Sequence, residues 1–343
     1  MVLVNFFSSP IGLGHITRDI AIKNNFQNIK TNFVTGSGAA KILKKLEIQA
    51  HDAYHPPSFV VENGTLKSPA KWLWNYYQYY KDCKNISQNI LEKDRPNAVI
   101  SDEDFASLTV AQEMKIPTIL ITDILETHFT KGLASFIEKK MNKSMQEIIK
   151  KCEVVILPEI GDVQDNIQRV GPIVRQTDYT REQLREKFSF DKKTIVISIG
   201  GTDAGLFLIE RALEAISKIN QDVEIVVVSG PSVQKRFEDV KNLGFVENLH
   251  EIIFASDVLI SLAGKSTIDE ANAYGTPAIF IPIKGHFEQE DNAKEMGFDF
   301  NDVFNLEELI KKSLNTDRNE PQENGVSVAG MEIAKILLKE NND

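Results

Sequence analysis

Short runs of branched apolar residues recur along this chain, and each leads into a turn and a helix-like stretch. Five runs lie in the first half: Val2–Phe7, Asn32–Thr35, Ala98–Ser101, Thr118–Thr122 and Val154–Leu157. Four lie in the second half: Thr194–Ile199, Glu224–Ser229, Val258–Ser261 and Ala278–Pro282. Val/Ile-rich strands that alternate with helices are typical of parallel sheets covered on both faces. We therefore predict an α/β fold of doubly wound parallel sheets, whose ligands bind beyond the carboxyl ends of the strands.

A Gly-Pro break separates the two series of strands. Gly171 and Pro172 interrupt the pattern, and a polar run follows. The length of 343 residues agrees with two domains of roughly 150 residues each. We predict Rossmann-like domains over residues 1–172 and 173–325 with a cleft between them, and a C-terminal helix over 326–343.

Charge and composition restrict the partners. The formal net charge is −10, and the excess of acidic residues lies after residue 172. Nucleic acids favour basic surfaces, so no nucleic-acid partner is expected. No run approaches the ~18 apolar residues of a membrane span, and Val2–Phe7 is expected to be a first strand rather than a signal peptide. The two cysteines, Cys83 and Cys152, favour a reducing compartment, so we expect a cytoplasmic protein.

Two glycine turns follow predicted strands in the second half. Gly200 and Gly201 precede a helix expected from about Leu206. Such turns allow close backbone approach, and the helix N-terminus offers N–H groups to an anion. A plain turn would show the same pattern, so phosphate binding and a plain turn remain equal alternatives.

The second turn opens a longer signal, Ser261–Pro282. Gly264 ends the strand, and Ser266 or Thr267 is expected to cap the next helix, so that its first N–H groups face a phosphate. Glu270 follows about one helical turn later, where a carboxylate could accept the hydroxyls of a ribose. Taken singly, a solvated helix face explains Glu270 better.

Together these elements resemble the donor-binding signature of GT-B glycosyltransferases, in particular the MurG-like, family 28 and family 1 groups. The matching residues are Gly264, Ser266–Thr267, Glu270, Gly275–Pro277, Pro282, Glu288–Gln289 within a predicted loop Lys284–Asn292, and Asn292–Ala293. The resemblance implies a GT-B fold and a nucleotide-sugar donor. Its diphosphate would lie among Gly200, Gly201, Gly264, Lys265, Ser266 and Thr267. Glu270 would hold the ribose, Val246 the base, and Glu288 and Gln289 the sugar hydroxyls.

The first loop of the chain carries a candidate base. Gly12 and Gly14 make a tight turn, and His15 stands at the start of a predicted helix, whose dipole would lower the pKa of the imidazole. A near-neutral His beside a cleft is a general base for a hydroxyl or a water. A His that only caps or packs at the turn is the equal alternative.

The spacing Gly-x-Gly-His-x-x-Arg resembles the first loop of GT-B enzymes, and the variant ending in Arg18 is typical of archaeal members. The resemblance implies that His15 is the catalytic base and that Gly12, Gly14 and Arg18 contact the acceptor. In family 1 relatives an Asp at a strand end orients this His, and Asp102 is the matching position. Asp102–Asp104 also matches a metal motif of the other glycosyltransferase fold, but GT-B members typically work without metal. No metal or cofactor is therefore expected.

Two further stretches concern the acceptor. Lys71–Tyr80 holds six aromatic residues, which stack on sugars or gather at lipid interfaces. A helix-packing face is the alternative that we favour slightly. His128–Lys151 has basic amphipathic spacing that would suit anionic lipid, although a solvated surface helix is the commoner explanation.

The resemblance implies transfer of a sugar, with N-acetylglucosamine as a candidate, from a UDP-sugar to an acceptor with inversion. The acceptor would be a sugar or a lipid-linked sugar, with peripheral contact at the inner face of the membrane as an option. Three alternatives stay open. They are a UDP-sugar hydrolase of the pseudaminic-acid type, a UDP-sugar 2-epimerase, and a non-catalytic nucleotide-sugar-binding partner of a membrane subunit.

Overall fold

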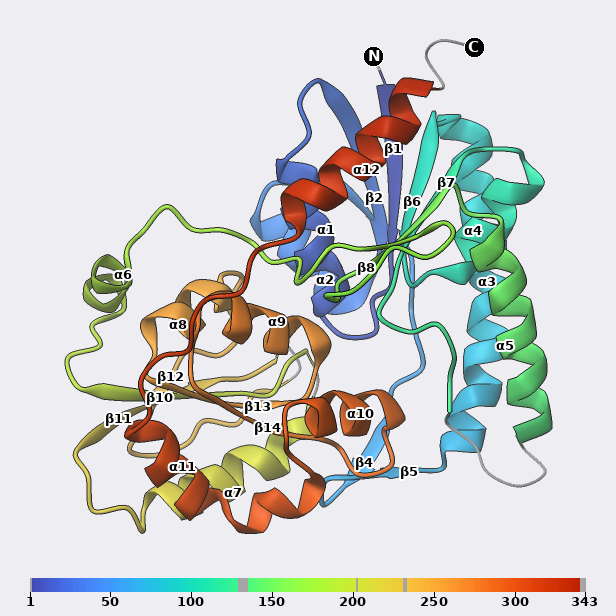
Figure 1. The fold of residues 1–343 in the computed structure, drawn as a ribbon. Coiled ribbons are helices and arrows are strands. Elements are labelled where there is room, and N and C mark those ends of the chain that lie inside the picture. The colour runs from blue at the N-terminus through green and yellow to red at the C-terminus, as the bar shows by residue number, and fades with distance from the viewer. Residues whose placement is uncertain (1, 129–134, 202, 231–232, 340–343) are drawn as a thin grey trace. The chain divides into compact units, whose positions relative to one another are not determined.

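The chain folds into two compact units in a computed structural model that describes residues 2–128, 135–201, 203–230 and 233–339 (Figure 1). Unit 1 comprises Met1–Ser58, Ser68–Ile173 and Asn324–Asp343, and unit 2 comprises Phe59–Lys67 and Val174–Glu323. This division departs from the predicted domains in two segments. Residues 59–67 belong to unit 2, and the C-terminal helix belongs to unit 1.

Unit 1 is built on a seven-stranded parallel sheet of order β3-β2-β1-β6-β7-β8-β9. The strands are β1 (Val2–Ser8), β2 (Ile29–Thr35), β3 (Ala50–Asp52), β6 (Ala98–Asp102), β7 (Thr118–Ile121), β8 (Val154–Leu157) and β9 (Ile167–Arg169). All five predicted strands are present. The register pairs Ser8 with Asp102 and Asp102 with Ile121, so the carboxyl ends of β1, β6 and β7 form one row.

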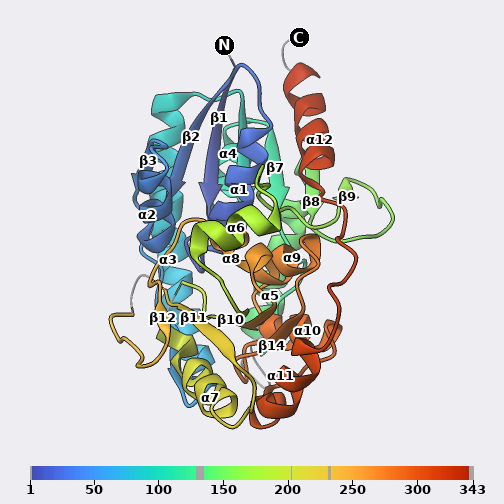
Figure 2. The ribbon, with the colours of Figure 1, turned by 90° about the vertical axis from the view of Figure 1, so that its left-hand side faces the viewer.

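Six helices accompany this sheet in the part of unit 1 that the structure describes: α1 (Gly14–Asn24), α2 (Ser37–Lys45), α3 (Pro69–Asp94), α4 (Phe105–Glu113), α5 (Ser135–Lys150) and α12 (Val326–Lys339). Helices α3 and α4 pack on the sheet face that presents Phe7, Val34 and Val99. Helix α12 comes from the far end of the chain and contacts α1 and β8 (Figure 2). Both sheet faces are therefore covered, as predicted.

Unit 2 contains a five-stranded parallel sheet of order β12-β11-β10-β13-β14. Its strands are β10 (Lys193–Ser198), β11 (Val223–Val228), β12 (Lys241–Asn242), β13 (Val258–Leu262) and β14 (Ala278–Ile281). Its α-helices are α6 (Arg181–Phe188), α7 (Leu206–Ile216), α8 (Leu249–Ala255), α9 (Lys265–Ala273), α10 (Phe287–Glu295) and α11 (Leu306–Leu314). The four predicted strands and the helix expected from Leu206 are confirmed.

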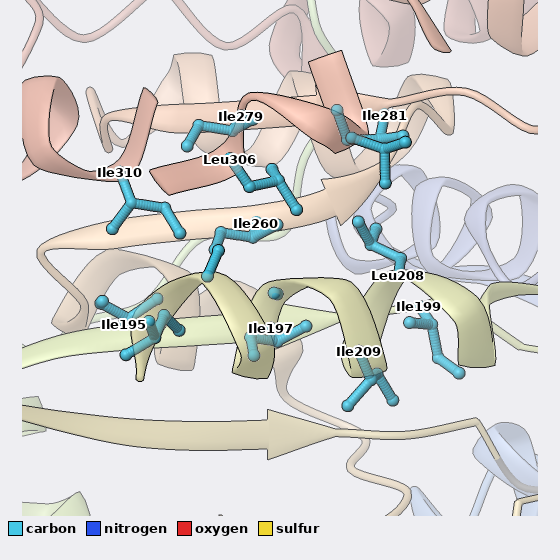
Figure 3. Packing of buried hydrophobic residues seen from close by; sticks show 14 of the residues in the cluster. Ile195, Ile197, Ile199, Leu208, Ile209, Ile260, Ile279, Ile281, Leu306 and Ile310 are labelled. Atoms are coloured by element: carbon cyan, nitrogen blue, oxygen red, sulfur yellow. The ribbon is translucent and has the colours of Figure 1, made fainter. Parts of the chain in front are cut away.

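The core of unit 2 lies on both faces of this sheet. Ile195 and Ile197 pack with Leu208 of α7 and Ile310 of α11, as Figure 3 shows. Val196, between them in sequence, packs on the opposite face with residues of α8 and α9. Successive side chains of a strand point to opposite faces, so a continuous apolar run fills two layers at once.

A two-stranded hairpin from the first half of the sequence completes unit 2. It consists of β4 (Val60–Glu62) and β5 (Thr65–Lys67). The Leu66 N–H donates to the Lys284 carbonyl at 2.8 Å, and the Lys284 N–H donates to the Gly64 carbonyl at 2.8 Å. Leu66 is part of the unit 2 core. Gly64 has a φ of +73°, and a Cβ there would lie 2.7 Å from the Phe207 ring, so the turn requires glycine.

Within the described residues, no helix has both the length and the apolar character needed to cross a bilayer. Cys83 and Cys152 are both free and buried.

Candidate active site

His15 lies at the carboxyl edge of the unit 1 sheet, beside the end of β6. The turn before it contains Gly12, whose φ is +90°, and Gly14 begins α1. The Nδ1 of His15 is 2.8 Å from Oδ1 of Asp102, the last residue of β6. Asp102 is fully buried. The structure therefore brings the predicted base and its predicted carboxylate partner into direct contact.

Arg18 follows His15 by one turn of α1 and binds the same carboxylate. Its Nε donates to Asp102 Oδ2 at 2.8 Å, and its Nη2 donates to Oδ1 at 2.6 Å. Its Nη1 donates to Asp123 at 3.4 Å. Sequence reasoning assigned Arg18 to the acceptor, but only 3% of this residue is exposed, and its guanidinium has carboxylate partners inside unit 1.

These charges determine the protonation of the cluster. Burial by itself would lower the pKa of His15, but the charge and hydrogen bond of Asp102, together with the charge of Glu103, raise it to about 10. Burial would raise the pKa of Asp102, but Arg18 and His15 hold it well below its ordinary value. The predicted lowering of the His15 pKa is wrong. A helix dipole contributes only ~0.3–1 kcal/mol, whereas a neighbouring carboxylate shifts a pKa by roughly 1–3 units.

Two acidic residues of this cluster were not predicted as site residues. Glu103 Oε1 accepts hydrogen bonds from the Thr122 hydroxyl at 2.9 Å and the Asp123 N–H at 3.2 Å. Its Oε2 lies 3.8 Å from His15 Nε2. Burial would raise the pKa of Asp123, but the charges of Arg18 and His15 and a hydrogen bond with Glu103 together lower it. The available signal was that Glu103 and Asp123 each follow a strand, and that β6 and β7 are neighbours.

Asp104 has a structural role. It is the N-cap of α4, where its carboxylate accepts from the Ala106 and Ser107 N–H groups, and it also accepts from the Tyr54 hydroxyl at 2.8 Å. Among the residues that the structure describes, no group of three or more His, Cys, Asp or Glu side chains is arranged to hold a metal ion.

In unit 2, two glycine turns lie at neighbouring strand ends. Gly200 follows β10 with a φ of +74°, and Gly264 is the N-cap residue of α9. A Cβ built on either glycine would meet no atom within 4 Å, so both turns face open space. The predicted cap by Ser266 or Thr267 is wrong, because these residues are the second and third of α9 and no side chain caps the helix.

The charged residues of α9 are largely buried. Lys265 Nζ is 2.5 Å from Asp269 Oδ1, so its charge is paired along the helix. Glu270 is 5% exposed, and burial raises its pKa to about 7, partly offset by the nearby charge of Arg175. Arg175 donates from Nη1 to the Glu247 carbonyl at 2.6 Å. Glu270 therefore lies in a buried polar region rather than on the solvated face of a helix.

The remaining predicted donor residues lie in segments that follow strands of the unit 2 sheet. Gly201 follows Gly200, and Val246 is half-buried between β12 and α8, against the unit 2 core. Glu288 and Gln289 were predicted to lie in a loop but belong to the first turn of α10. Acidic residues favour the first turn of a helix, which explains the difference. Gln289 Oε1 accepts from the Ile283 N–H at 3.0 Å.

Comparisons with known proteins concern the sequence and the fold. The family model for the glycosyltransferase family 28 C-terminal domain matches residues 194–324, most of unit 2. An uncharacterized glycosyltransferase of Methanopyrus kandleri is 24% identical over 225 residues, which are 61% of this chain and 63% of that protein. The chain thus spans less than two thirds of this relative.

A second relative is covered almost completely. The UDP-N-acetylglucosamine--N-acetylmuramyl-(pentapeptide) pyrophosphoryl-undecaprenol N-acetylglucosamine transferase of Thermosipho africanus is 26% identical, over 95% of this chain and 96% of that protein. The crystal structure of the glycosyltransferase SnogD from Streptomyces nogalater superposes with a TM-score of 0.60 at 16% identity, over 99% of this chain and 96% of that one. The fold is therefore GT-B, the two-sheet architecture of many glycosyltransferases. The sequence predicted this fold, and residues 194–324 match the family 28 C-terminal domain.

Proposed function

We propose that this protein transfers a sugar from a UDP-sugar to an acceptor hydroxyl, with inversion at the anomeric carbon. The observation that carries the proposal is the contact between His15 and Asp102, in a chain whose unit 2 matches a family 28 C-terminal domain. N-acetylglucosamine is the first candidate sugar, because the name of the Thermosipho africanus relative specifies it.

His15 and Asp102 have complementary roles in this proposal. The imidazole mediates removal of the proton from the acceptor hydroxyl, and Asp102 fixes the ring through Nδ1 and stabilises its cationic form. Arg18 positions Asp102, because its two hydrogen bonds hold both carboxylate oxygens. We propose that no metal takes part.

The donor is proposed to bind at the glycine turns of unit 2. A Cβ on Gly200 or Gly264 would meet no atom, so neither turn blocks a diphosphate, and the N-terminus of α9 would supply N–H groups to it. Such fixed dipoles also stabilise charge that develops on the departing diphosphate. Glu270 is proposed to accept the ribose hydroxyls, Val246 to contact the base, and Glu288 with Gln289 to contact the sugar.

Thermal melting against UDP, GDP, ADP, dTDP and their sugars tests the donor. A ligand at 100 times its dissociation constant adds about 2.7 kcal/mol of stability, which shifts the melting temperature by several degrees. A shift with UDP and UDP-sugars is expected. A flat response to every nucleotide would contradict the donor site.

The acceptor requires a second assay, since a UDP-sugar hydrolase would use the same His15 to activate water. UDP release is therefore measured with and without candidate acceptors. Transfer predicts release that depends on an acceptor. Release of UDP and free sugar at the same rate without acceptor would favour the hydrolase, and an isomerised donor without UDP release would favour the 2-epimerase.

We also propose peripheral contact between unit 1 and an anionic membrane, which would suit a lipid-linked acceptor. Trp74 and Tyr77 on α3 are 62% and 42% exposed, and Phe136 on α5 is 76% exposed. Exposed lysines accompany them on both helices: Lys71, Lys81, Lys139, Lys140 and Lys143. Aromatic side chains with neighbouring cations bind the interface of anionic bilayers. Trp72 is buried, as the packing alternative expects, whereas Trp74 and Tyr77 are exposed and are not explained by packing.

Residues 129–134 of the predicted amphipathic stretch lie outside the described residues.

Vesicle sedimentation tests this surface. Binding to phosphatidylglycerol vesicles is expected to exceed binding to phosphatidylcholine vesicles and to weaken with salt. Trp74→Ala with Phe136→Ala should reduce it. Phe304→Ala is the matched control, because Phe304 is 65% exposed but belongs to unit 2. Equal binding by both sets of variants would contradict the proposal.

A further inference from the structure

A second carboxylate faces the ring nitrogen of His15 that Asp102 leaves available. Glu103 Oε2 lies 3.8 Å from His15 Nε2, and both side chains are mostly buried. We infer that Glu103 is the net acceptor of the proton that leaves the acceptor hydroxyl, and that His15 relays this proton. The inference rests on the proposed function and deepens it.

The backbone and side chain of Glu103 are held in this orientation. Its φ is +57°, a left-handed conformation that is unfavourable for a non-glycine residue and must be held by the surrounding structure. Its N–H donates to the Ile121 carbonyl at 3.2 Å. Oε1 accepts hydrogen bonds from the Thr122 hydroxyl and the Asp123 N–H, and Oε2 lies 3.8 Å from His15 Nε2.

The distance fits a shared hydroxyl. Nε2 and Oε2 are too far apart for a good direct hydrogen bond, which is at most about 3.2 Å long. An acceptor oxygen can lie about 2.8 Å from both atoms at once, at the apex of a triangle. It would then contact the relay and the final proton acceptor together.

The charges around His15 explain why a relay is needed. Asp102 and Glu103 face it from the end of β6, Arg18 and Asp19 from α1, and Asp123 from the segment after β7. With its pKa raised, His15 carries protons on both nitrogens at neutral pH. An imidazolium can act as a base only after it has released its Nε2 proton, and Glu103 can take that proton through a hydroxyl that contacts both side chains.

The proton and electron balance is simple. The shared hydroxyl first gives its proton to Glu103 Oε2 and takes the Nε2 proton in exchange, which leaves His15 neutral. The O–H bond of the acceptor then breaks, and its proton passes to Nε2. The acceptor oxygen bonds to the anomeric carbon, and the bond from that carbon to the diphosphate breaks, with its electron pair leaving on the diphosphate. The charge on His15 is the same before and after, and Glu103 becomes neutral.

Glu103→Gln tests this assignment because it keeps the shape and the Oε1 contacts but removes the charge. Glu47→Gln is the matched control, since Glu47 has a φ of +57° at the end of α2 but is exposed and lies outside this cluster. The titration of His15 is followed by ¹⁵N NMR and assigned with His15→Gln. Glu103→Gln should lower the midpoint by about one pH unit or more, and Glu47→Gln should leave it unchanged.

Turnover is measured on the same proteins as UDP release from UDP-sugars. Glu103→Gln should lower kcat by roughly a hundredfold or more, with the donor KM within about threefold of wild type. Glu103→Asp, which retains a carboxylate, should recover part of this loss. Unchanged turnover in Glu103→Gln, or an unchanged His15 midpoint, would overturn the assignment. A wild-type protein that releases no UDP from any donor would overturn the proposed function, and this assignment with it.

Discussion

The two units place different chemistry at the carboxyl ends of similar parallel sheets. In unit 1 the sheet edge holds buried, mutually paired side-chain charges, with His15 and Arg18 opposite Asp102 and Asp123. In unit 2 the corresponding edge presents bare glycine turns and a helix N-terminus, and the charge of Lys265 is taken up by Asp269. The chemistry at the edge of the unit 1 sheet therefore comes from charged side chains. At the edge of the unit 2 sheet it comes from exposed backbone, where glycines lack side chains.

The buried acids also differ between the units. In unit 1 a strong cation keeps Asp102 ionised, whereas in unit 2 burial dominates and Glu270 remains partly protonated near neutral pH. The first arrangement keeps an ion pair fixed. The second leaves a carboxyl group whose charge a ligand or a change in pH can alter.

The largest effect is expected from substitutions that break the ion pair between His15 and Asp102 in unit 1. His15→Gln or Asp102→Asn should lower turnover by roughly 10²–10⁴-fold, because proton transfer loses its mediator or its orienting partner. UDP-dependent melting shifts should persist, since the donor turns are in unit 2. Steady-state kinetics and melting measure the two effects, with exposed His51→Gln as control. Parallel loss of donor binding would mean that His15 is structural.

The next largest effect is expected from a substitution that tests whether the β4–β5 hairpin belongs to unit 2. Leu66→Ala should lower the free energy of unfolding by about 2–4 kcal/mol, because Leu66 is 7% exposed in the unit 2 core. Urea unfolding measures the loss, and hydrogen exchange should locate it in unit 2. Val60→Ala, at a position that is 57% exposed on the same hairpin, should change little. Faster exchange confined to unit 1 would contradict the division.

A smaller effect concerns Glu270 and has a definite sign. Its pKa is raised from 4.5 to about 7, so its contribution to stability is fully present below pH 4.5 and is lost as the pH rises through 7. Glu270→Gln cannot ionise and should therefore be more stable than wild type above pH 7 by about 1–3 kcal/mol. The two proteins should match near pH 4. Denaturant unfolding at both pH values measures this, and a less stable variant at pH 8 would contradict it.

His15 and Glu270 should also affect stability in different pH ranges. The pKa of His15 is raised from 6.5 to about 10, so its contribution is fully present below pH 6.5 and is lost as the pH rises through 10. Alkaline loss of stability should therefore be shallower in His15→Gln than in wild type. Glu270→Gln should instead change the slope at lower pH. If His15→Gln changed the slope at the lower pH and Glu270→Gln changed it at alkaline pH, the assignment of these pKa shifts to the two residues would be wrong.

The smallest effect adds a single methyl group in unit 2. Gly264 has a φ of −78° and open space around it, so Gly264→Ala should fold normally. Its Cβ would intrude on the proposed diphosphate site and weaken UDP binding by roughly tenfold, about 1.4 kcal/mol. Calorimetry measures the affinity. Gly330→Ala in α12, whose Cβ would come no closer than 3.6 Å to Asn25, is the control.

The sequence predicted the frame well because the frame depends on local patterns. Buried parallel strands are continuous apolar runs, and all nine predicted strands occur. The β4–β5 hairpin was missed because its strands are short and are held by Lys284, more than two hundred residues away in sequence. No periodic pattern encodes such a partner.

The candidate site was predictable as residues but not as a network. The loop spacing indicated His15, and the strand end indicated Asp102. Arg18 was assigned to the acceptor because a sequence does not show that the residue is buried beside Asp102. The pKa of His15 was predicted in the wrong direction because nearby charge outweighs the helix dipole. Glu103 was missed because its role depends on its left-handed backbone and on the 3.8 Å distance from its Oε2 to His15 Nε2. Neither can be predicted from the sequence.

Two segments belong to a different unit from their neighbours in sequence: residues 59–67 are part of unit 2, and residues 324–343 are part of unit 1. These segments limit how the protein can be recombined with its relatives. A fragment that begins at Ile173 lacks Leu66 from its core and the hydrogen-bonding partners of Lys284. A fragment that ends at Pro172 lacks α12, which packs on α1. A crossover at the Gly-Pro break would therefore join two incomplete folds. Units of this kind can be inherited intact only when residues 59–67 travel with the second sheet and residues 324–343 with the first.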